Sequence, residues 1–127
     1  MLDAPSSFEP AKNYVITVLV ARKGMKSGGF QLSARFSETG SQAGSFRPLD
    51  GRTSVTSEKA GSIFYIQHTR EGQKLTGETE GKWQFQWQAP NRRAPVTMHM
   101  AANAANRDAS EFGDSIHTRD LTIPPAK

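Results

Sequence analysis

The residues best suited to chemistry lie near the C-terminus, in an oxygen-rich stretch that could hold a hard cation. Polar side chains recur there at relative positions 1, 3, 5 and 9 of a candidate calcium loop: Asn106, Asp108, Ser110 and Asp114. Glu111 stands where an EF-hand has glycine, so the match is poor. The alternative is that these side chains bond their own backbone and shape a connection between strands. We favour this structural role and keep calcium as the one cofactor hypothesis.

The histidines are a second candidate metal set, since neutral imidazole binds zinc and copper. The chain has three of them: His68, His99 and His117. Met98 and Met100 flank His99, but strand alternation puts both on the opposite face from it, so the three cannot share one pocket. We expect His68 and Thr69 to make buried or turn hydrogen bonds instead, and the methionines to fill the core.

Patterns typical of catalysis are missing from the sequence. It has no cysteine, no Gly-x-Ser-x-Gly, no His-Glu-x-x-His, no phosphate loop and no dinucleotide-binding glycine pattern. The candidate acidic pairs fall in expected loops: Glu71, Glu78, Glu80, Asp108, Glu111 and Asp114. We therefore predict that the chain is not an enzyme.

Composition further restricts the classes of protein to which the chain can belong. A chain of 127 residues with 35% hydrophobic residues is the size of one domain, which we place at residues 1–127. The net charge of +4 is scattered along the chain, so nucleic-acid binding is not favoured. No run approaches the about 20 apolar residues of a membrane span, so no membrane insertion is expected.

Strands must position these residues, because apolar side chains recur at every second position. The clearest case is "GKWQFQWQAP", where Trp83, Phe85 and Trp87 alternate with polar residues. This alternation favours core tryptophans over a sugar-stacking surface. Two apolar faces in "NYVITVLVAR" predict a central strand, or an edge strand covered on both sides, whereas "GFQLSARFS" predicts Gln31, Ser33 and Arg35 on a face open to water.

Further strands are expected in "SIFYIQHT", "PVTMHMAA" and "SIHTRDLTI", separated by glycine- and proline-rich turns. The block "AANAAN" has helical propensity, but we expect it to continue the strand that begins at Val96. The fold class predicted is all-β: an immunoglobulin-like antiparallel β-sandwich of seven or eight strands, with a barrel as the alternative.

The order of these motifs resembles the Reeler (reelin-type) domain family, and is most similar to bacterial Reeler-like domains of secreted and cell-envelope proteins. The motifs are "FEPAKNYVITVLVARKGMKSGGFQLSARF", "YIQHT", "WQFQWQAP" and "PVTMHMAANAANRDASEFGDSIHT", over residues 8–123. The residues that match the family signature are His68, Thr69, Trp83, Trp87, Asn103, Asn106 and Asp114.

The resemblance implies a non-catalytic binding module that contacts a protein or a glycan outside the cell or at its envelope, through loops at one end of the sandwich. Some relatives carry an upstream Cys-x-x-Cys-His haem motif, so an accessory domain of a haem c redox protein is the alternative. The N-terminus lacks the basic and apolar regions of a signal peptide. The protein is therefore either cytosolic or has a signal segment that is absent from this chain. Because the resemblance is to secreted and envelope domains, we expect the second: a secreted, periplasmic or surface protein.

The calcium hypothesis makes a prediction about thermal stability. A cation that binds only the folded state raises the midpoint of unfolding, so a melt in millimolar calcium should lie above a melt in chelator. Circular dichroism at both conditions measures the difference. Coincident curves would exclude a calcium site in the loop.

Overall fold

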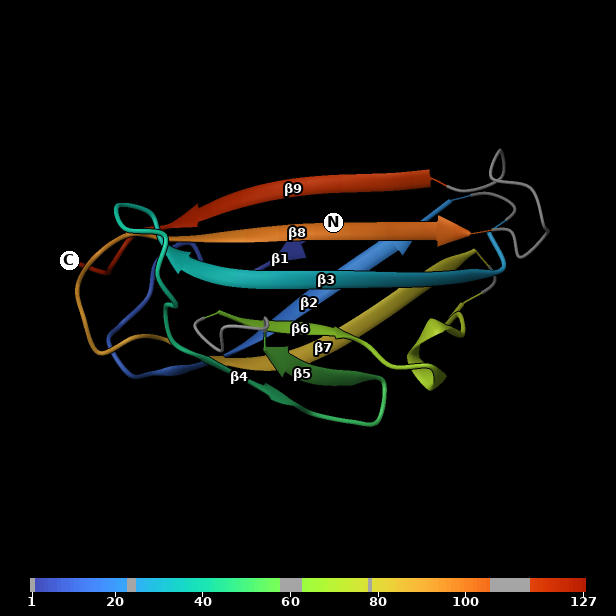
Figure 1. Cartoon of the computed structure of the whole chain (residues 1–127), viewed down its shortest axis with the longest axis horizontal. Helices are drawn as coiled ribbons and strands as arrows, with labels where there is room; N and C mark the ends of the chain where they lie inside the picture. The colour runs from blue at the N-terminus through green and yellow to red at the C-terminus, as the bar shows by residue number, and fades with distance from the viewer. Residues whose placement is uncertain (1, 23–24, 58–62, 78, 106–114) are drawn as a thin grey trace.

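The computed structural model describes residues 2–22, 25–57, 63–77, 79–105 and 115–127, and it shows two antiparallel sheets packed face to face (Figure 1). The strands are β1 (Leu2–Asp3), β2 (Asn13–Ala21), β3 (Ser27–Phe36), β4 (Ser45–Pro48), β5 (Thr53–Ser57), β6 (Phe64–His68), β7 (Glu80–Gln88), β8 (Val96–Ala105) and β9 (Ser115–Ile123), with a 3₁₀ turn η1 (Glu71–Gln73). One sheet has the order β1-β2-β7-β4 and the other β5-β6-β3-β8-β9. No helix in these ranges has the length and apolar character needed to cross a bilayer.

The predicted antiparallel β-sandwich is confirmed, but the described residues form nine strands rather than seven or eight. β1 has two residues and β4 has four, which is too short for alternation to be visible in the sequence. β5 begins at Thr53, in a part of the chain where no strand was expected from the sequence. These three strands are all peripheral to the long central ones.

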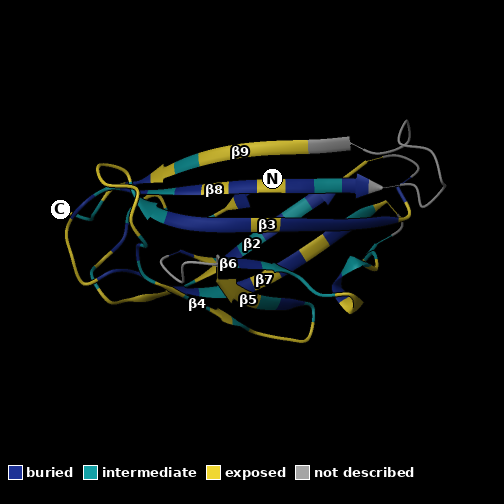
Figure 2. Ribbon diagram, viewed as in Figure 1, coloured by how far each residue is buried: buried dark blue, intermediate teal, exposed yellow. Residues whose placement is uncertain are grey.

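The alanine- and asparagine-rich block is a strand, as expected. β8 continues through it to Ala105 and pairs along its length with β3 on one side and with β9 on the other. Ala102 and Ala104 face the core and are buried, and the buried positions of β8 alternate with exposed or intermediate ones in Figure 2. Pairing on both edges provides hydrogen-bond partners for the backbone of β8, and this outweighs the intrinsic helical preference of its alanines.

β2 is the predicted central strand, yet only one of its faces is covered. Ile16 and Val18 are fully buried against the other sheet, whereas Val15 is 57% exposed on the outer face. The idea of a strand covered on both sides was therefore wrong, because nothing among the described residues packs over the outer face at Val15.

The water-exposed face predicted for β3 is also only partly correct. Gln31 is exposed, but Ser33 is 2% exposed and Arg35 is half-buried. Ser33 lies on the outer face of the sheet, where longer neighbours cover it: the Arg35 Nε donates to its Oγ at 3.3 Å. Alternation assigns the face correctly and does not report what covers it.

Both tryptophans belong to the core, as the alternation predicted. Trp83 is 1% exposed and its Nε1 donates to the Gly72 carbonyl at 2.8 Å. Trp87 is fully buried and its Nε1 donates to the Ala43 carbonyl at 3.1 Å. Each indole thus fixes a loop to the core through its one polar atom.

Replacing Trp83 with phenylalanine should destabilise the fold by about 2 kcal/mol. The change leaves a cavity and removes the indole N–H from the Gly72 carbonyl, which keeps the Arg52 Nη2 as a donor. Urea unfolding measures the loss, with Gln84→Ala on the exposed face of the same strand as the control. A Trp83→Phe variant as stable as that control would contradict the packing described.

Candidate functional site

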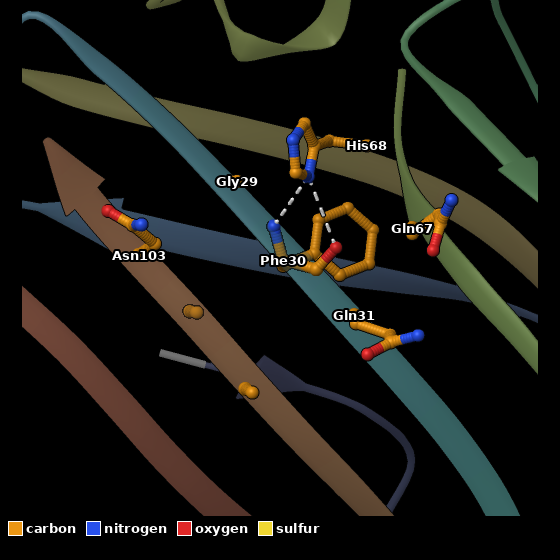
Figure 3. A pocket seen from close by; sticks show the side chains of 8 residues that line it. Gly29, Phe30, Gln31, Gln67, His68 and Asn103 are labelled. Carbon is orange, nitrogen blue, oxygen red and sulfur yellow. Dashed lines mark hydrogen bonds between the residues drawn. The ribbon is translucent and has the colours of Figure 1, made fainter. Parts of the chain in front are cut away.

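His68 lies where β6 separates from β3 and takes the place of a backbone partner. The two strands pair only at Gln31 with Gln67 and at Leu32 with Ile66, so the next residue along β3, Phe30, has no strand opposite it. The His68 Nδ1 lies 3.1 Å from the Phe30 nitrogen and 3.3 Å from the Phe30 oxygen (Figure 3). With the proton on Nε2, Nδ1 accepts the Phe30 N–H.

Gly29 provides the space in which this ring sits. A Cβ at Gly29 would lie 2.4 Å from the His68 Cε1, closer than non-bonded carbon atoms approach. The expected strand "GFQLSARFS" begins at Gly29, and β3 begins two residues earlier, so that both Gly28 and Gly29 belong to the strand. A side chain at position 29 would push the imidazole off the strand.

Thr69, the other half of the His-Thr pair, ties two turns together. Its hydroxyl donates to the Gly51 carbonyl at 2.6 Å and accepts the Gly72 N–H at 3.0 Å. The prediction that His68 and Thr69 make buried or turn hydrogen bonds is therefore confirmed. Together, His68 and Thr69 fix the position of the chain where β6 separates from β3.

A hollow of about 330 Å³ opens on the outer face where the strands part. We call it the His68 groove; its lining residues are Gly29, Phe30, Gln31, Gln67, His68, Ala101, Ala102 and Asn103. A smaller hollow of about 170 Å³ continues it past Asn103 to Ser27 and Gln73. The floor consists of small residues and the rim carries amides and an imidazole.

Asn103 stands across β3 from His68, on β8 opposite Gly29 (Figure 3). Its Oδ1 is buried and accepts no hydrogen bond from any described residue. A buried acceptor without a donor costs free energy, so a turn of the half-buried Asn103 amide that brings this oxygen to a donor, on the protein or on a bound molecule, would recover that cost.

A second hollow of about 270 Å³ adjoins the groove through Gln31 and Ala101. We call it the Arg35 hollow; its polar lining residues are Gln31, Ser33, Arg35, Tyr65, His99, Thr118 and Asp120. The Arg35 Nη2 donates to the Tyr65 hydroxyl at 2.9 Å, and the His99 Nδ1 lies 2.9 Å from the Asp120 Oδ1. The two hollows together form one polar surface on the outer face of the five-stranded sheet.

Asp120, His99 and Ser33 lie in a row across β9, β8 and β3, an order that suggests a catalytic triad. The row does not work as one. The Ser33 hydroxyl is bonded by Arg35 rather than by His99, and it is almost fully buried. The backbone N–H groups around Ser33 are used in the sheet, so no pair is aimed at an oxyanion.

The predicted metal residues are placed as follows. Asn106, Asp108, Ser110 and Asp114 lie outside the described residues, so the calcium hypothesis stays a prediction. His99 is exposed on the face opposite to the buried Met98 and Met100, as alternation required. Within the described part of the chain, no three His, Cys, Asp or Glu side chains gather closely enough to hold a metal ion.

Reasoning from the sequence identified His68 and Asn103 as signature residues and missed most of the surface around them. Those missed are Gly29, Gln31, Arg35, Tyr65, Gln67 and Asp120. The only local signal was alternation, which gave Gln31 and Arg35 an outward direction. Their meeting depends on the pairing of strands far apart in the chain.

Comparison with known structures shows what fold carries this surface. The chain is similar to the human F-spondin reeler domain, with a TM-score of 0.57 and 17% identity over 96% of this chain and 86% of that one. A structure of the Reelin-N domain of F-spondin gives a TM-score of 0.60 and 16% identity over 97% and 80%. The fold likeness that the motif order implied is thus confirmed; the closer tie to bacterial members stays a prediction.

The same fold occurs in a different kind of module. A cohesin module of a family 33 glycoside hydrolase from Clostridium perfringens has a TM-score of 0.58 and 7% identity over 98% of this chain and 93% of that one. No family model and no curated protein sequence matches the chain. The similarity to solved structures therefore establishes the fold, and the function has to be argued from the site.

Substituting Gly29 with alanine should destabilise the protein by about 1–3 kcal/mol, because it displaces His68 from the Phe30 N–H. His68→Ala should cost a similar amount. The double variant should cost little more than either single one, since both remove the same hydrogen bond. Urea unfolding of the three variants measures this.

Gly51→Ala is the matched control for that series. Its Cβ would meet only the Glu71 Oε2, at 3.4 Å, so its stability should stay within about 0.5 kcal/mol of the parent. Additive losses in the Gly29 and His68 double variant would show that the ring is not seated as described.

Proposed function

We propose that the chain is a non-catalytic interaction module of the Reeler type, which acts outside the cell or at the cell envelope and binds a protein or a glycan. The observation that carries the proposal is the polar surface formed by the His68 groove and the Arg35 hollow on β3, β6, β8 and β9. Loops at one end of the sandwich were the binding surface expected from the sequence; the surface proposed here lies on a sheet face.

Two independent lines support the Reeler assignment. The order of motifs along residues 8–123 is similar to that of the family, and the fold matches two F-spondin structures over nearly the whole chain. The placement outside the cell or at the envelope comes from that family resemblance.

The character of the surface supports binding rather than catalysis. Its polar groups include the amides of Gln31, Gln67 and Asn103 and two side-chain pairs, Arg35 with Tyr65 and His99 with Asp120. The part-buried pair of Arg35 and Tyr65 holds a fixed position, which favours recognition of a ligand of defined shape, while the pair of His99 and Asp120 is exposed. Ser33, the one hydroxyl in the row with His99, lacks the contact with a base that a nucleophile needs.

Binding assays with two matched arginine variants test this proposal. Ala101→Arg places a long cation at the exposed residue that both hollows share, and Val15→Arg places the same group on the exposed outer face of the four-stranded sheet. The parent domain is probed on a glycan array and against proteins extracted from the cell exterior. We expect Ala101→Arg to lose binding by tenfold or more, as about 1.4 kcal/mol of lost contact produces, while Val15→Arg binds normally.

Two results would contradict the proposal. One is the absence of any saturable binding to arrayed glycans or extracted proteins. The other is loss of binding in Val15→Arg with binding retained in Ala101→Arg, which would place the interaction on the opposite sheet.

A further inference from the structure

The His68 groove has a chemistry that selects among the ligands left open above. We propose that it binds one sugar unit of a neutral oligosaccharide, with Asn103, Gln31 and Gln67 as the hydrogen-bonding residues. This inference rests on the proposed function, because it names the ligand class for the same surface.

The first argument is charge. None of the described residues that line the groove or its continuation past Asn103 is Asp, Glu, Lys or Arg. A sulfate, phosphate or carboxylate placed there would lose its water without gaining a cationic partner, which is costly. The groove therefore favours an uncharged ligand, although the whole chain carries a net charge of +4.

The second argument is the type of polar group on the rim. A side-chain amide offers both donors and an acceptor, and a sugar hydroxyl is likewise both donor and acceptor. The Asn103 side chain is half-buried at the groove and its Oδ1 accepts no hydrogen bond from a described residue, so the amide can turn toward a ligand hydroxyl without losing a bond of that oxygen. Gln31 and Gln67 lie opposite each other across β3 and β6, so their amides flank the other side of the groove (Figure 3).

The third argument separates a sugar from an extended peptide. A peptide that adds to a sheet needs a free row of backbone N–H and C=O groups. Here the backbone of β3 from Gly29 to Gln31 is paired with β8, and the remaining edge at Phe30 is occupied by His68. The groove thus provides side-chain amides to a ligand, but no free strand edge to which a peptide could add.

The dimensions agree with a single ring. A volume of about 330 Å³ is at the lower end of the about 300–1,000 Å³ typical of small-molecule sites. Gly29 and the exposed Ala101 present little or no side chain on the outer face, so a ring can approach the strands closely there. A second unit would extend toward the half-buried Tyr65, whose ring can contact the apolar face of a sugar.

The side-chain NH₂ signals of Gln31, Gln67 and Asn103 provide a direct test by NMR of ¹⁵N-labelled protein. The probes are maltose, cellobiose and N,N′-diacetylchitobiose, each titrated to millimolar concentration. A sulfated heparin disaccharide and a capped Val-Thr-Val-Thr peptide are titrated in parallel. We expect at least one neutral sugar to shift these three signals in a saturable way, and neither parallel probe to do so.

Variants then assign the contacts. Gln31→Ala should raise the dissociation constant of the sugar that binds by roughly threefold to tenfold, the usual effect of one lost hydrogen bond. Ala101→Trp fills the floor at an exposed strand position, which tolerates an aromatic residue, and should abolish binding. Gln86→Ala, on the four-stranded sheet, is the matched control and should bind as the parent does.

The inference is overturned if no neutral sugar gives a saturable shift at the groove, or if the sulfated disaccharide or the peptide shifts the three signals instead. It also falls if Ala101→Trp binds the sugar normally. The proposed function still stands if the domain binds an extracted protein and Ala101→Arg abolishes that binding. The proposed function fails if the parent domain binds neither a glycan nor a protein.

Discussion

The position of Phe30 on β3 is the constraint on which both the core and the groove depend. Its ring packs 5.3 Å from the Trp83 ring and 5.9 Å from that of Phe85, between the two sheets. Its backbone, on the same strand, is held by His68 at the point where β6 leaves the sheet. Because the ring fixes β3 from inside and the imidazole fixes it at the edge, the gap between β3 and β6 has a defined width. The His68 groove is the outer side of that gap.

The long strands could be predicted from the sequence because their signal is local. Trp83, Phe85 and Trp87 alternate with polar residues, and one sheet face buries all three. β8 was predictable for a different reason: its alanines follow a strand pattern that begins at Val96, and continuing it keeps small side chains toward the core. β1 and β4 carry too few residues to show a period, and their pairing with β2 and β7 is decided by neighbours far along the chain.

The candidate site was less accessible to prediction, because its residues meet only through strand pairing. Gln31 and Gln67 are 36 positions apart in the sequence and become opposite neighbours across β3 and β6. His68 was expected to make a buried or turn hydrogen bond, and it does, but its partner Phe30 could not be named without the register. Gly29 shows the same limit: a glycine pair in sequence is typical of a turn, whereas here the missing side chain makes room for a ring on a flat strand.

The fold by itself does not choose a function, because reeler domains and a cohesin module match the chain almost equally well. In this sandwich the pairing of β6 with β3 ends at Gln67 and Gln31, and the groove lies at that end. In a regular five-stranded sheet the backbone groups of Phe30 would be paired with those of a neighbouring strand. The outer face there would have no hollow other than those between side chains. The departure of β6 at Gln67 replaces one backbone pair with an imidazole, and the hollow that lies there is lined by His68, Gly29 and Asn103. A site built this way depends on Gly29, His68 and Asn103 together, so a sandwich that lacks any of the three can keep the fold and lose the groove.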